Sequence, residues 1–321
     1  MAKKIIGIDL GGTTIKFGFL DVDGNILSKW NIPTDISDDG KHIVPDIIHS
    51  INEQIRKQDL RSTDFYGVGM GTPGSINQEK GTVTGAYNLN WKEEQNVGEE
   101  ISKGLHLPII IENDANSAAL GEYWRGAGNN SNDAVFVTLG TGVGGGVIID
   151  GSLVHGANGG GGEIGHITVE ENGYLCTCGK RGCLERYASA TGIVQLAKDM
   201  ARDFNGHSQL KELEDTNQEV SSKTVFFLAD NGDILANQVV DKVTHYLGKA
   251  LSYIGNSLNP NNIIIGGGVS NAGNTLLQPT THYFQNNAFP AVRDSTRLKL
   301  AQLGNDAGLI GAASLALRFN D

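Results

Sequence analysis

Apolar residues open the chain in short runs that glycine-containing turns separate. The runs over residues 3–9, 15–21 and 25–32 each have the length of a strand. Gly11-Gly12-Thr13-Thr14 lies between the first two, and Asp23-Gly24 turns the chain before the third. The pattern predicts an antiparallel meander that opens on a loop rich in glycine and threonine.

A second segment repeats this pattern. Strands are predicted over residues 134–139, 145–149 and 152–155, and Gly140-Thr141-Gly142 follows the first of them. We expect an internal repeat, in which each copy is a sheet with helices packed on it. Chance similarity between two short glycine loops is the alternative.

Apolar residues at helical spacing predict helices after each meander. The isoleucines at positions 47, 48, 51 and 55 share one helical face, and apolar positions between Val239 and Leu258 indicate a long helix. Asn259-Pro260 ends the long helix, and residues 263–265 then form a buried strand that runs into Gly266-Gly267-Gly268. A third glycine turn is thus predicted at the end of a strand.

Length and composition indicate a globular protein of more than one core. The chain has 321 residues, which favours two domains, or one domain split by another. Hydrophobic residues make up 39% and charged residues 19%, as in folded proteins. The polar stretch over residues 208–223 is interpreted as a surface excursion.

Charge and cysteine content exclude several classes of function. The net charge of −11 opposes nucleic-acid binding, which needs clustered Lys and Arg. The apolar run after Met1 is too short for a signal peptide, and nowhere do 18 apolar residues run together, so we expect a cytoplasmic protein without a membrane partner. All three cysteines lie between positions 176 and 183, which suits a metal site in a reducing compartment.

The two Gly-Thr loops suit phosphate binding. Glycine at a strand end lets backbone N–H groups approach phosphate oxygens, and two such loops could bind one polyphosphate. For either loop alone, an ordinary hairpin turn is the alternative. The loop at Gly140 also matches a dinucleotide fingerprint, but a strand follows it where that fold needs a helix. A Walker loop is excluded because none of the Gly-Lys pairs, at 40–41, 179–180 and 248–249, precedes Ser or Thr.

Carboxylates follow two of the predicted strands. Asp9 ends the first strand, where it could hold Mg²⁺ against phosphate oxygens directly or through water; capping of the loop is the alternative. Residues 108–111 form another strand, which delivers Glu112-Asn113-Asp114 to the start of a helical run. In phosphoryl transfer a carboxylate accepts the proton of the attacking alcohol, so Asp114 is the candidate base. Its other local interpretation is the N-cap of the following helix.

One histidine and three cysteines lie close together in the sequence: His166, Cys176, Cys178 and Cys183. These nitrogen and sulfur ligands suit a closed tetrahedral Zn²⁺ site of structural type, with no open position for water. Glu163 and Glu185 flank the cysteines, and acceptor-only carboxylates suit the binding of several sugar hydroxyls. Taken singly, each glutamate is typical of a solvated surface.

These motifs resemble, across nearly the whole chain, those of the ROK family of bacterial sugar kinases and sugar-responsive repressors. The matching segments are Asp9-Leu-Gly-Gly-Thr-Thr, Gly140-Thr-Gly-Val-Gly, Glu163-Ile-Gly-His and Cys-x-Cys-Gly-x-x-Gly-Cys-x-Glu. The resemblance implies an α/β fold, the two-domain actin-like, ribonuclease-H-like fold of sugar kinases, with an interdomain cleft, a zinc knuckle and a homodimeric assembly. On this basis we expect a smaller domain over residues 1–115, completed by a C-terminal helix at 306–321. A larger domain over 116–305 would carry the zinc site.

The resemblance also implies a role for each matched residue. Asp114 would be the general base on the 6-hydroxyl of a hexose, and His166 would bind zinc through one ring nitrogen and a sugar hydroxyl through the other. The residues implied in sugar binding are Asn88, placed by the Asn-Leu-Asn-Trp run alone, Asn113, Glu163, His166 and Glu185. The residues implied in holding Mg²⁺ and ATP are Asp9, Gly11, Gly12, Thr13, Thr14, Thr141, Gly142, Gly267 and Gly268, with the last two near the adenosine.

Phosphorylation of glucose by ATP is the activity we expect. Kinases of this family also accept N-acetylmannosamine, N-acetylglucosamine, fructose or allose, and sequence does not give the geometry that separates these sugars. The family's repressors carry a DNA-binding helix-turn-helix ahead of the first strand, which is predicted here from Lys3, so a regulator is not expected. A purely structural actin-like filament protein would need neither the carboxylates nor the zinc knuckle.

Overall fold

The structure is a computed structural model that describes residues 3–319. The chain forms two compact units: unit 1 holds residues 3–130, 153–161 and 303–319, and unit 2 holds residues 131–152 and 162–302. This division differs from the expected boundary after residue 115, which would cut helix α4 (Asp114–Arg125). Helix α4 belongs to unit 1 because it packs along helix α12 (Ala307–Leu315). The outermost residues of the predicted domain limits, 1, 2, 320 and 321, lie outside the described residues.

Unit 1 is built on a sheet with strand order β3-β2-β1-β4-β7. Strands β1 (Lys4–Leu10), β2 (Thr14–Leu20) and β3 (Ile26–Pro33) pair antiparallel, which confirms the predicted meander. Strands β4 (Phe65–Thr72) and β7 (Ile109–Asn113) continue the sheet parallel to β1. Strand β4 was not predicted, because alternate glycines hide its apolar pattern.

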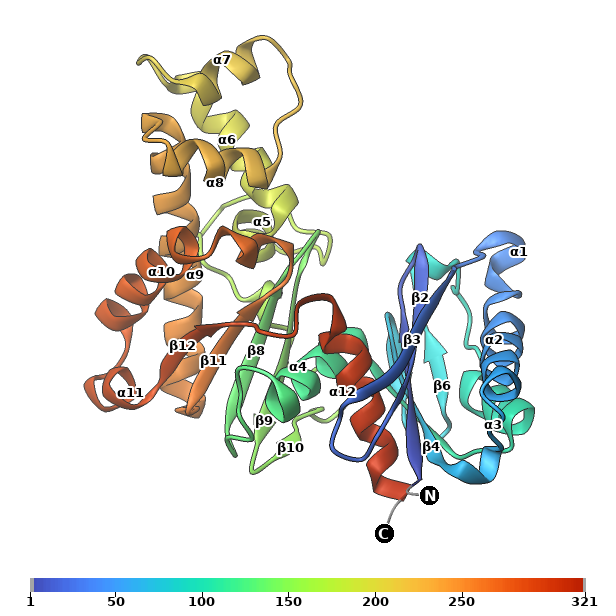
Figure 1. Ribbon diagram of the computed structural model, residues 1–321. Helices are drawn as coiled ribbons and strands as arrows, with labels where there is room; N and C mark the ends of the chain where they lie inside the picture. Colours follow the sequence, from blue (N-terminus) through green and yellow to red (C-terminus); the bar gives the residue numbers. More distant parts are fainter. Residues whose placement is uncertain (1–2, 320–321) are drawn as a thin grey trace. The chain divides into compact units, whose positions relative to one another are not determined.

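Helices cover both faces of this sheet (Figure 1). On one face, α2 (Ile43–Lys57) and α3 (Val97–Leu105) share a core with Ile6 and Ile8 of β1. On the other face, α12 packs on Ile5 of the same strand. The alternation of Ile5 with its neighbours is the period of two expected for a strand buried on both sides. The remaining short elements of unit 1 are η1 (Ser62–Asp64), β5 (Ser75–Asn77), β6 (Thr82–Thr84), η2 (Tyr87–Leu89), α1 (Ser37–Gly40), η5 (Gly304–Asp306) and η6 (Ala316–Phe319).

Unit 2 repeats the connectivity of unit 1. Its strands are β8 (Ala134–Leu139), β9 (Val143–Ile149), β10 (Ser152–Leu153), β11 (Asn262–Gly266) and β12 (Arg297–Leu300). The sheet order is β10-β9-β8-β11-β12, in which β8 pairs antiparallel with β9 and parallel with β11. In both units the first strand therefore turns back through a Gly-Thr loop and lies beside a later parallel strand, as the predicted repeat requires. Strand β10 is shorter than predicted because residues 154 and 155 leave the sheet.

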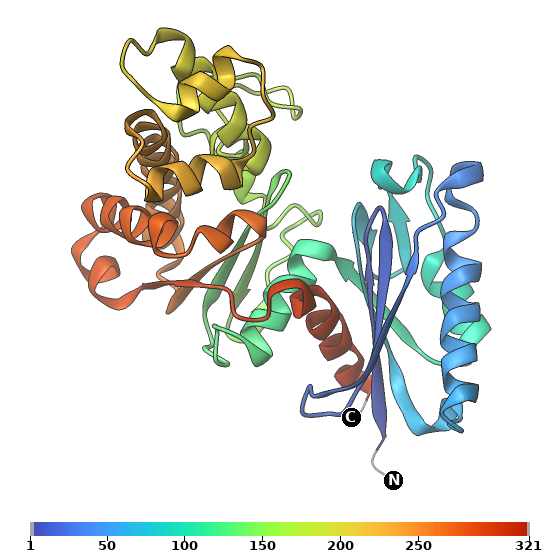
Figure 2. The same cartoon turned by 45° about the horizontal axis from the view of Figure 1, so that its top comes forward.

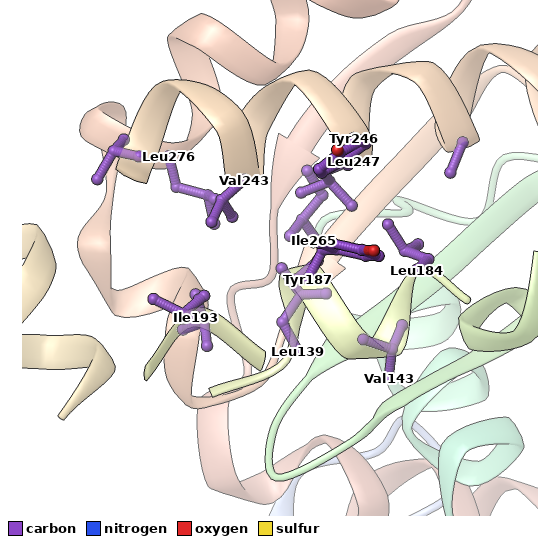
Figure 3. Close-up of a cluster of buried hydrophobic side chains, with 14 of the residues drawn as sticks. Leu139, Val143, Leu184, Tyr187, Ile193, Val243, Tyr246, Leu247, Ile265 and Leu276 are labelled. Carbon is purple, nitrogen blue, oxygen red and sulfur yellow. The ribbon is translucent and has the colours of Figure 1, made fainter. Parts of the chain in front are cut away.

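The core of unit 2 lies between its sheet and its helices. Figure 3 shows Leu139 and Ile265 from the sheet together with Tyr187, Val243 and Leu247 from the helices. The helices are α5 (Glu185–Ala188), α6 (Ala190–Asp203), α7 (Gln209–Asp215), α8 (Ser222–Asp230), α9 (Ile234–Leu258), α10 (Asn274–Asn287) and α11 (Pro290–Ser295), with turns η3 (Ile164–His166) and η4 (Gly268–Ala272). As predicted, the long helix α9 ends at Asn259, in the left-handed conformation (φ 45°), directly before Pro260.

The polar stretch over residues 208–223 is not merely a surface excursion. It contains helix α7, whose Leu210 is fully buried, and Asp233 accepts hydrogen bonds from the Ser208 hydroxyl and the Gln209 N–H. The sequence pattern missed this helix because a single buried leucine leaves little periodicity. Among the described residues, no helix has the length and apolarity needed to span a membrane.

Helices α4 and α12 touch through glycines, and both views of unit 1 show them side by side (Figure 2). A Cβ added to Gly311 would lie 1.7 Å from the carbonyl oxygen of Ser117, and one added to Gly121 would lie 2.1 Å from that of Ala307. No side chain can occupy either position unless the backbones separate.

We therefore predict that Gly311→Ala destabilises the protein. Alanine improves helix propensity by about 1 kcal/mol, but forcing a methyl group against a backbone oxygen should cost more, with a net loss of about 1–3 kcal/mol. Thermal unfolding followed by circular dichroism measures the change. Gly160→Ala is the control, since its nearest neighbour is the flexible Asn158 side chain at 3.3 Å. A Gly311→Ala protein as stable as the wild type would contradict the packing argument.

Candidate active site

The first Gly-Thr loop, Gly11 to Thr13, connects β1 to β2 and is held by its own backbone and by Thr34. The Gly11 N–H donates to the Thr14 carbonyl at 3.1 Å, and the Thr34 hydroxyl donates to the Gly11 carbonyl at 2.7 Å. Within residues 3–319 the N–H groups of Gly12 and Thr13 have no protein acceptor, so they can donate to an anion. Thr14 itself begins β2.

Asn88 lies against this loop. A Cβ on Gly12 would come within 3.3 Å of the Asn88 carbonyl oxygen and 3.4 Å of its Nδ2. The structure thus brings a residue predicted from one short sequence run to the first loop, and the side chain of Asn88 is exposed there.

Asp9 pairs with Lys16. The lysine Nζ donates to Asp9 Oδ2 at 2.9 Å and to the Asn305 carbonyl at 3.1 Å. In the described chain this contact, and not a loop N–H, satisfies the Asp9 carboxylate, so loop capping is not its role. Lys16 was not predicted as a site residue, although a four-residue turn after Leu10 would have placed it opposite Asp9 in the hairpin.

Strand register brings Asp9 and Asp114 to the same edge of the sheet. Asp9 lies opposite Gly71 of β4, and Gly71 lies opposite Glu112 of β7. Residues in one row of a sheet with one strand between them are about 10 Å apart. Asp114 follows Glu112 by two positions and begins helix α4.

Asn113, not Asp114, is the N-cap of α4. The Asn113 side-chain oxygen accepts from the N–H groups of Ala115 at 2.9 Å and Asn116 at 3.3 Å. The alternative interpretation of Asp114 as the cap is therefore wrong. Asp114 occupies the first helical position with an exposed side chain, whose Oδ1 also accepts from the Ala115 N–H at 2.9 Å.

The surroundings of Asp114 favour its protonated form. Its side chain is exposed, but nearby protein removes part of the water around the carboxyl group, and this desolvation raises the pKa of Asp114 above its ordinary value of 3.8. The hydrogen bond from Ala115 opposes the shift, and the negative charge of Asp9 adds to it. A raised pKa is the direction expected for a general base that must accept a proton near neutral pH.

The second Gly-Thr loop belongs to unit 2 and joins β8 to β9. The Gly140 carbonyl accepts from the Ala190 N–H at 2.8 Å, and the Thr141 carbonyl accepts from the Thr191 hydroxyl at 2.9 Å. Both donors come from the start of helix α6, so these two hydrogen bonds hold the loop against that helix. Within the described residues the N–H groups of Thr141 and Gly142 have no protein acceptor.

Glu185 connects this loop to the cysteines. Its Oε2 accepts from the Val143 N–H at 3.1 Å, and its Oε1 lies 3.8 Å from the Cys176 sulfur. A Cβ on Gly142 would come within 2.5 Å of the same Oε2, so the close approach requires glycine. This position was predicted for sugar binding, and the structure shows that both oxygens already have protein neighbours.

The predicted metal ligands gather in one cluster. Ligand atoms of His166, Cys176, Cys178 and Cys183 all lie within 4.8 Å of one another. The Cys178 and Cys183 sulfurs are 3.6 Å apart, and the Cys176 sulfur lies 3.7 Å from His166 Nδ1. Tetrahedral Zn²⁺ with bonds of about 2.3 Å to sulfur separates its ligands by about 3.8 Å. The donor set and its spacing therefore fit zinc.

The other nitrogen of His166 points to Glu163. His166 Nε2 lies 3.8 Å from Glu163 Oε2, and the glutamate side chain is exposed. With Nδ1 among the cysteines, Nε2 is the nitrogen that remains for a ligand.

The third glycine turn borders a pocket of about 400 Å³ in unit 2. Gly267 has φ 82°, and a Cβ there would meet the backbone of Leu139 at 2.5 Å, so only glycine fits. Of the two predicted glycines, Gly268 lines the pocket. The other lining residues are Ser222, Lys223, Phe226, Phe227, Asp230, Val269, Asn271 and Ala272. The contact between helix α8 and this turn was not predicted, because the two segments are far apart in the chain.

The candidate residues are distributed over both units. Unit 1 contributes Asp9, Gly11, Gly12, Thr13, Thr14, Asn88, Asn113 and Asp114. Unit 2 contributes Thr141, Gly142, Glu163, His166, Cys176, Cys178, Cys183, Glu185, Gly267 and Gly268. Each unit thus has one Gly-Thr loop and its own set of polar side chains.

This chain is similar along nearly its whole length to known proteins of one family. Residues 5–318 match the model of the ROK family. The glucokinase of Halalkalibacterium halodurans is 44% identical over 311 residues, which cover 97% of this chain and 94% of that protein.

Two solved structures extend the comparison. A ROK family glucokinase from Streptomyces griseus, in complex with glucose and AMPPNP, is 33% identical with a TM-score of 0.78, covering 98% of this chain and 99% of that one. A ROK family transcriptional regulator, a homologue of the E. coli MLC protein, is 26% identical with a TM-score of 0.87 and covers 99% of this chain and 79% of that one. The match over nearly the whole chain shows that this protein belongs to the ROK family.

Proposed function

We propose that this protein phosphorylates glucose with ATP to give glucose 6-phosphate. The observation that carries the proposal is Asp114, a carboxylate with a raised pKa at the start of α4, beside its cap Asn113. Relatives named glucokinase are 36–44% identical to this chain, which supports the same activity, and the AMPPNP complex of the Streptomyces griseus glucokinase supports ATP as the phosphoryl donor. Asp114 would accept the proton of the sugar 6-hydroxyl as that oxygen attacks the γ-phosphorus and ADP leaves.

The Gly-Thr loops would bind the phosphates of ATP. Their N–H groups at Gly12, Thr13, Thr141 and Gly142 supply hydrogen-bond donors without intervening side chains. Asp9 would hold Mg²⁺ through Oδ1, directly or through water, since Oδ2 is engaged by Lys16. The adenosine would occupy the pocket beside Gly268, whose mixed apolar and polar lining suits a base and a ribose.

Sugar binding would draw on Asn88, Asn113, Glu163, His166 and Glu185. The Asn113 oxygen caps α4, so its Nδ2 is the group that can donate to a sugar hydroxyl. The carboxylate of Glu163 is exposed and can accept from hydroxyls. Zinc on the three cysteines and His166 Nδ1 would have a structural role and fix the ring plane of His166, so that Nε2 faces the sugar. We also propose a cytoplasmic homodimer that acts on small molecules alone.

Purified protein should phosphorylate glucose in the presence of ATP and Mg²⁺, and Asp114→Asn should lower kcat by about 10²–10⁴ while sugar binding persists. A coupled assay measures both, across a panel with N-acetylmannosamine, N-acetylglucosamine, fructose and allose. Asp46→Asn, in the first turn of α2, is the control and should retain activity. Preference for another hexose would correct the substrate, and turnover by Asp114→Asn within a few-fold of wild type would reject the base.

The raised pKa of Asp114 also predicts a stability effect. Because its folded-state pKa lies above the unfolded value, the protonated form stabilises the fold, and this contribution is lost as pH rises through the folded pKa. At neutral pH, Asp114→Asn should therefore raise the melting temperature, and the gain should vanish in acid. Wild-type kcat/KM should fall as pH decreases through the same pKa. Melting curves from acid to neutral pH test this, and a variant less stable than wild type at pH 7 would count against it.

Loss of zinc should weaken sugar binding although the metal touches no reacting atom. Glu185 and His166 both neighbour the cluster, and each sugar hydroxyl left without its partner costs about 1–3 kcal/mol. Cys176→Ser should therefore raise the glucose Kd by about tenfold or more, and saturating glucose should slow zinc loss to a chelator.

Metal content by mass spectrometry and glucose affinity by calorimetry provide the measurements for this prediction. Glu171→Gln, an exposed position between His166 and Cys176, is the control and should keep both metal and affinity. An active protein without zinc, or a Cys176→Ser protein that loses metal yet binds glucose normally, would refute it.

A further inference from the structure

Glu112 is a buried carboxylate for which the proposed reaction has no role. Its side chain is 2% exposed. Oε1 accepts from the Asn113 N–H and the Asn116 amide, each at 2.9 Å, and Oε2 accepts from Gln78 Nε2 and His155 Nε2, each at 2.7 Å. All four partners donate, which suits an ionised carboxylate with an acceptor site at each oxygen. Such a group is costly to bury unless its partners are kept in place.

The four donors come from three separate parts of unit 1. Asn113 and Asn116 belong to the strand end and helix that carry Asp114. Gln78 follows β5 in the β5–β6 hairpin, and His155 lies in the segment 153–161, where the chain enters unit 1 and leaves it again. One carboxylate thus connects the hairpin and segment 153–161 to the end of β7, directly before Asp114.

His155 is the anchor of the crossing segment. Its ring must carry the proton on Nε2 to donate to Glu112, so Gln78, 3.2 Å from the same nitrogen, directs its own donor to the carboxylate. Residues 156–160 are exposed. In the described chain, the other side-chain hydrogen bond of segment 153–161 is local, from the Gly160 N–H to Asn158.

The segment closes on itself directly after its anchor. The Gly161 N–H donates to the His155 carbonyl at 2.8 Å, with Gly156 and Gly159 at φ 72° and 81° in between. Fixing His155 therefore also fixes Gly161, which precedes Glu163 by two residues, or at most about 7 Å of chain. Without the anchor, the exposed and glycine-rich residues 156–160 would lose this fixed conformation.

We propose that Glu112 and His155 are positioning residues for sugar phosphorylation. Their hydrogen bond sets where the chain begins its run to Glu163 and His166, while the other oxygen of Glu112 holds the strand end beside the base. Neither residue touches a reacting atom. The expected kinetic effect rests on the proposed kinase function, whereas the expected effect on the segment itself does not.

Removal of the anchor should act on sugar binding more than on turnover. In His155→Ala we expect the KM for glucose to rise by about tenfold and kcat to fall by less, which corresponds to a loss of one sugar contact. His155→Gln should return KM to within about threefold of wild type, because its amide can donate to Glu112. His42→Ala is the matched control, since His42 pairs with Asp38 at 3.3 Å on the exposed surface of unit 1.

Hydrogen exchange measured without sugar or ATP provides a readout that is independent of catalysis. Amides of residues 156–163 should exchange faster in His155→Ala, and at the wild-type rate in His155→Gln and His42→Ala. If His155→Ala does not fold, His155→Asn, whose amide is too short to reach Glu112, takes its place with the same expectations.

The two hypotheses fail in different ways. If the wild type phosphorylates no hexose, the proposed function is wrong, and the exchange rates still decide whether His155 anchors the segment. If the wild type is active but His155→Ala keeps both its KM and its exchange rates, the positioning role is overturned. A loss that His155→Gln does not rescue would also overturn it, because the lost feature would then not be the hydrogen bond.

Discussion

The backbone contact between α4 and α12 is the constraint on which the candidate base depends. Helix α12 lies against β1 and β4 because Gly7 and Gly69 have no Cβ, and against α4 because Gly121 and Gly311 have none. The same short helix therefore sets the distance between the strand that carries Asp9 and the helix that begins with Asp114. Any side chain at these glycines would move the carboxylates relative to each other. Close packing transmits such a shift, since protein interiors have few voids to absorb it.

In unit 2 the carboxylate of Glu185 links the second Gly-Thr loop to the metal-ligand cluster. Glu185 joins the Val143 N–H, next to the second Gly-Thr loop, to Cys176 of the metal cluster. The loop, the cluster and a candidate sugar ligand are thus connected through one side chain. A metal bound there without an open coordination position would fix the geometry of the proposed sugar ligands without touching a reacting atom.

The fold alone does not decide between enzyme and regulator. The chain is structurally similar both to a ROK family glucokinase and to a ROK family transcriptional regulator, with TM-scores of 0.78 and 0.87. Function must therefore be argued from chemical groups. The arrangement that favours phosphoryl transfer is a candidate base, Asp114, with a raised pKa, an Asp9–Lys16 pair beside a loop of unpaired N–H groups, and a second such loop in unit 2.

Features that depend on local patterns could be predicted from the chain alone. Apolar runs predict both meanders, Pro260 predicts the end of the long helix at Asn259, and closely spaced ligands predict the cluster from His166 to Cys183. The partners of Asp9 and Glu112, the capping role of Asn113 and the unit to which α4 belongs depend instead on tertiary packing. Glu112 and His155 are 43 positions apart, so no local pattern links them. Helix α7 buries only one leucine, which leaves too little periodicity to predict a helix. Such contacts depend on how distant segments pack, and a single sequence carries no periodic signal for that.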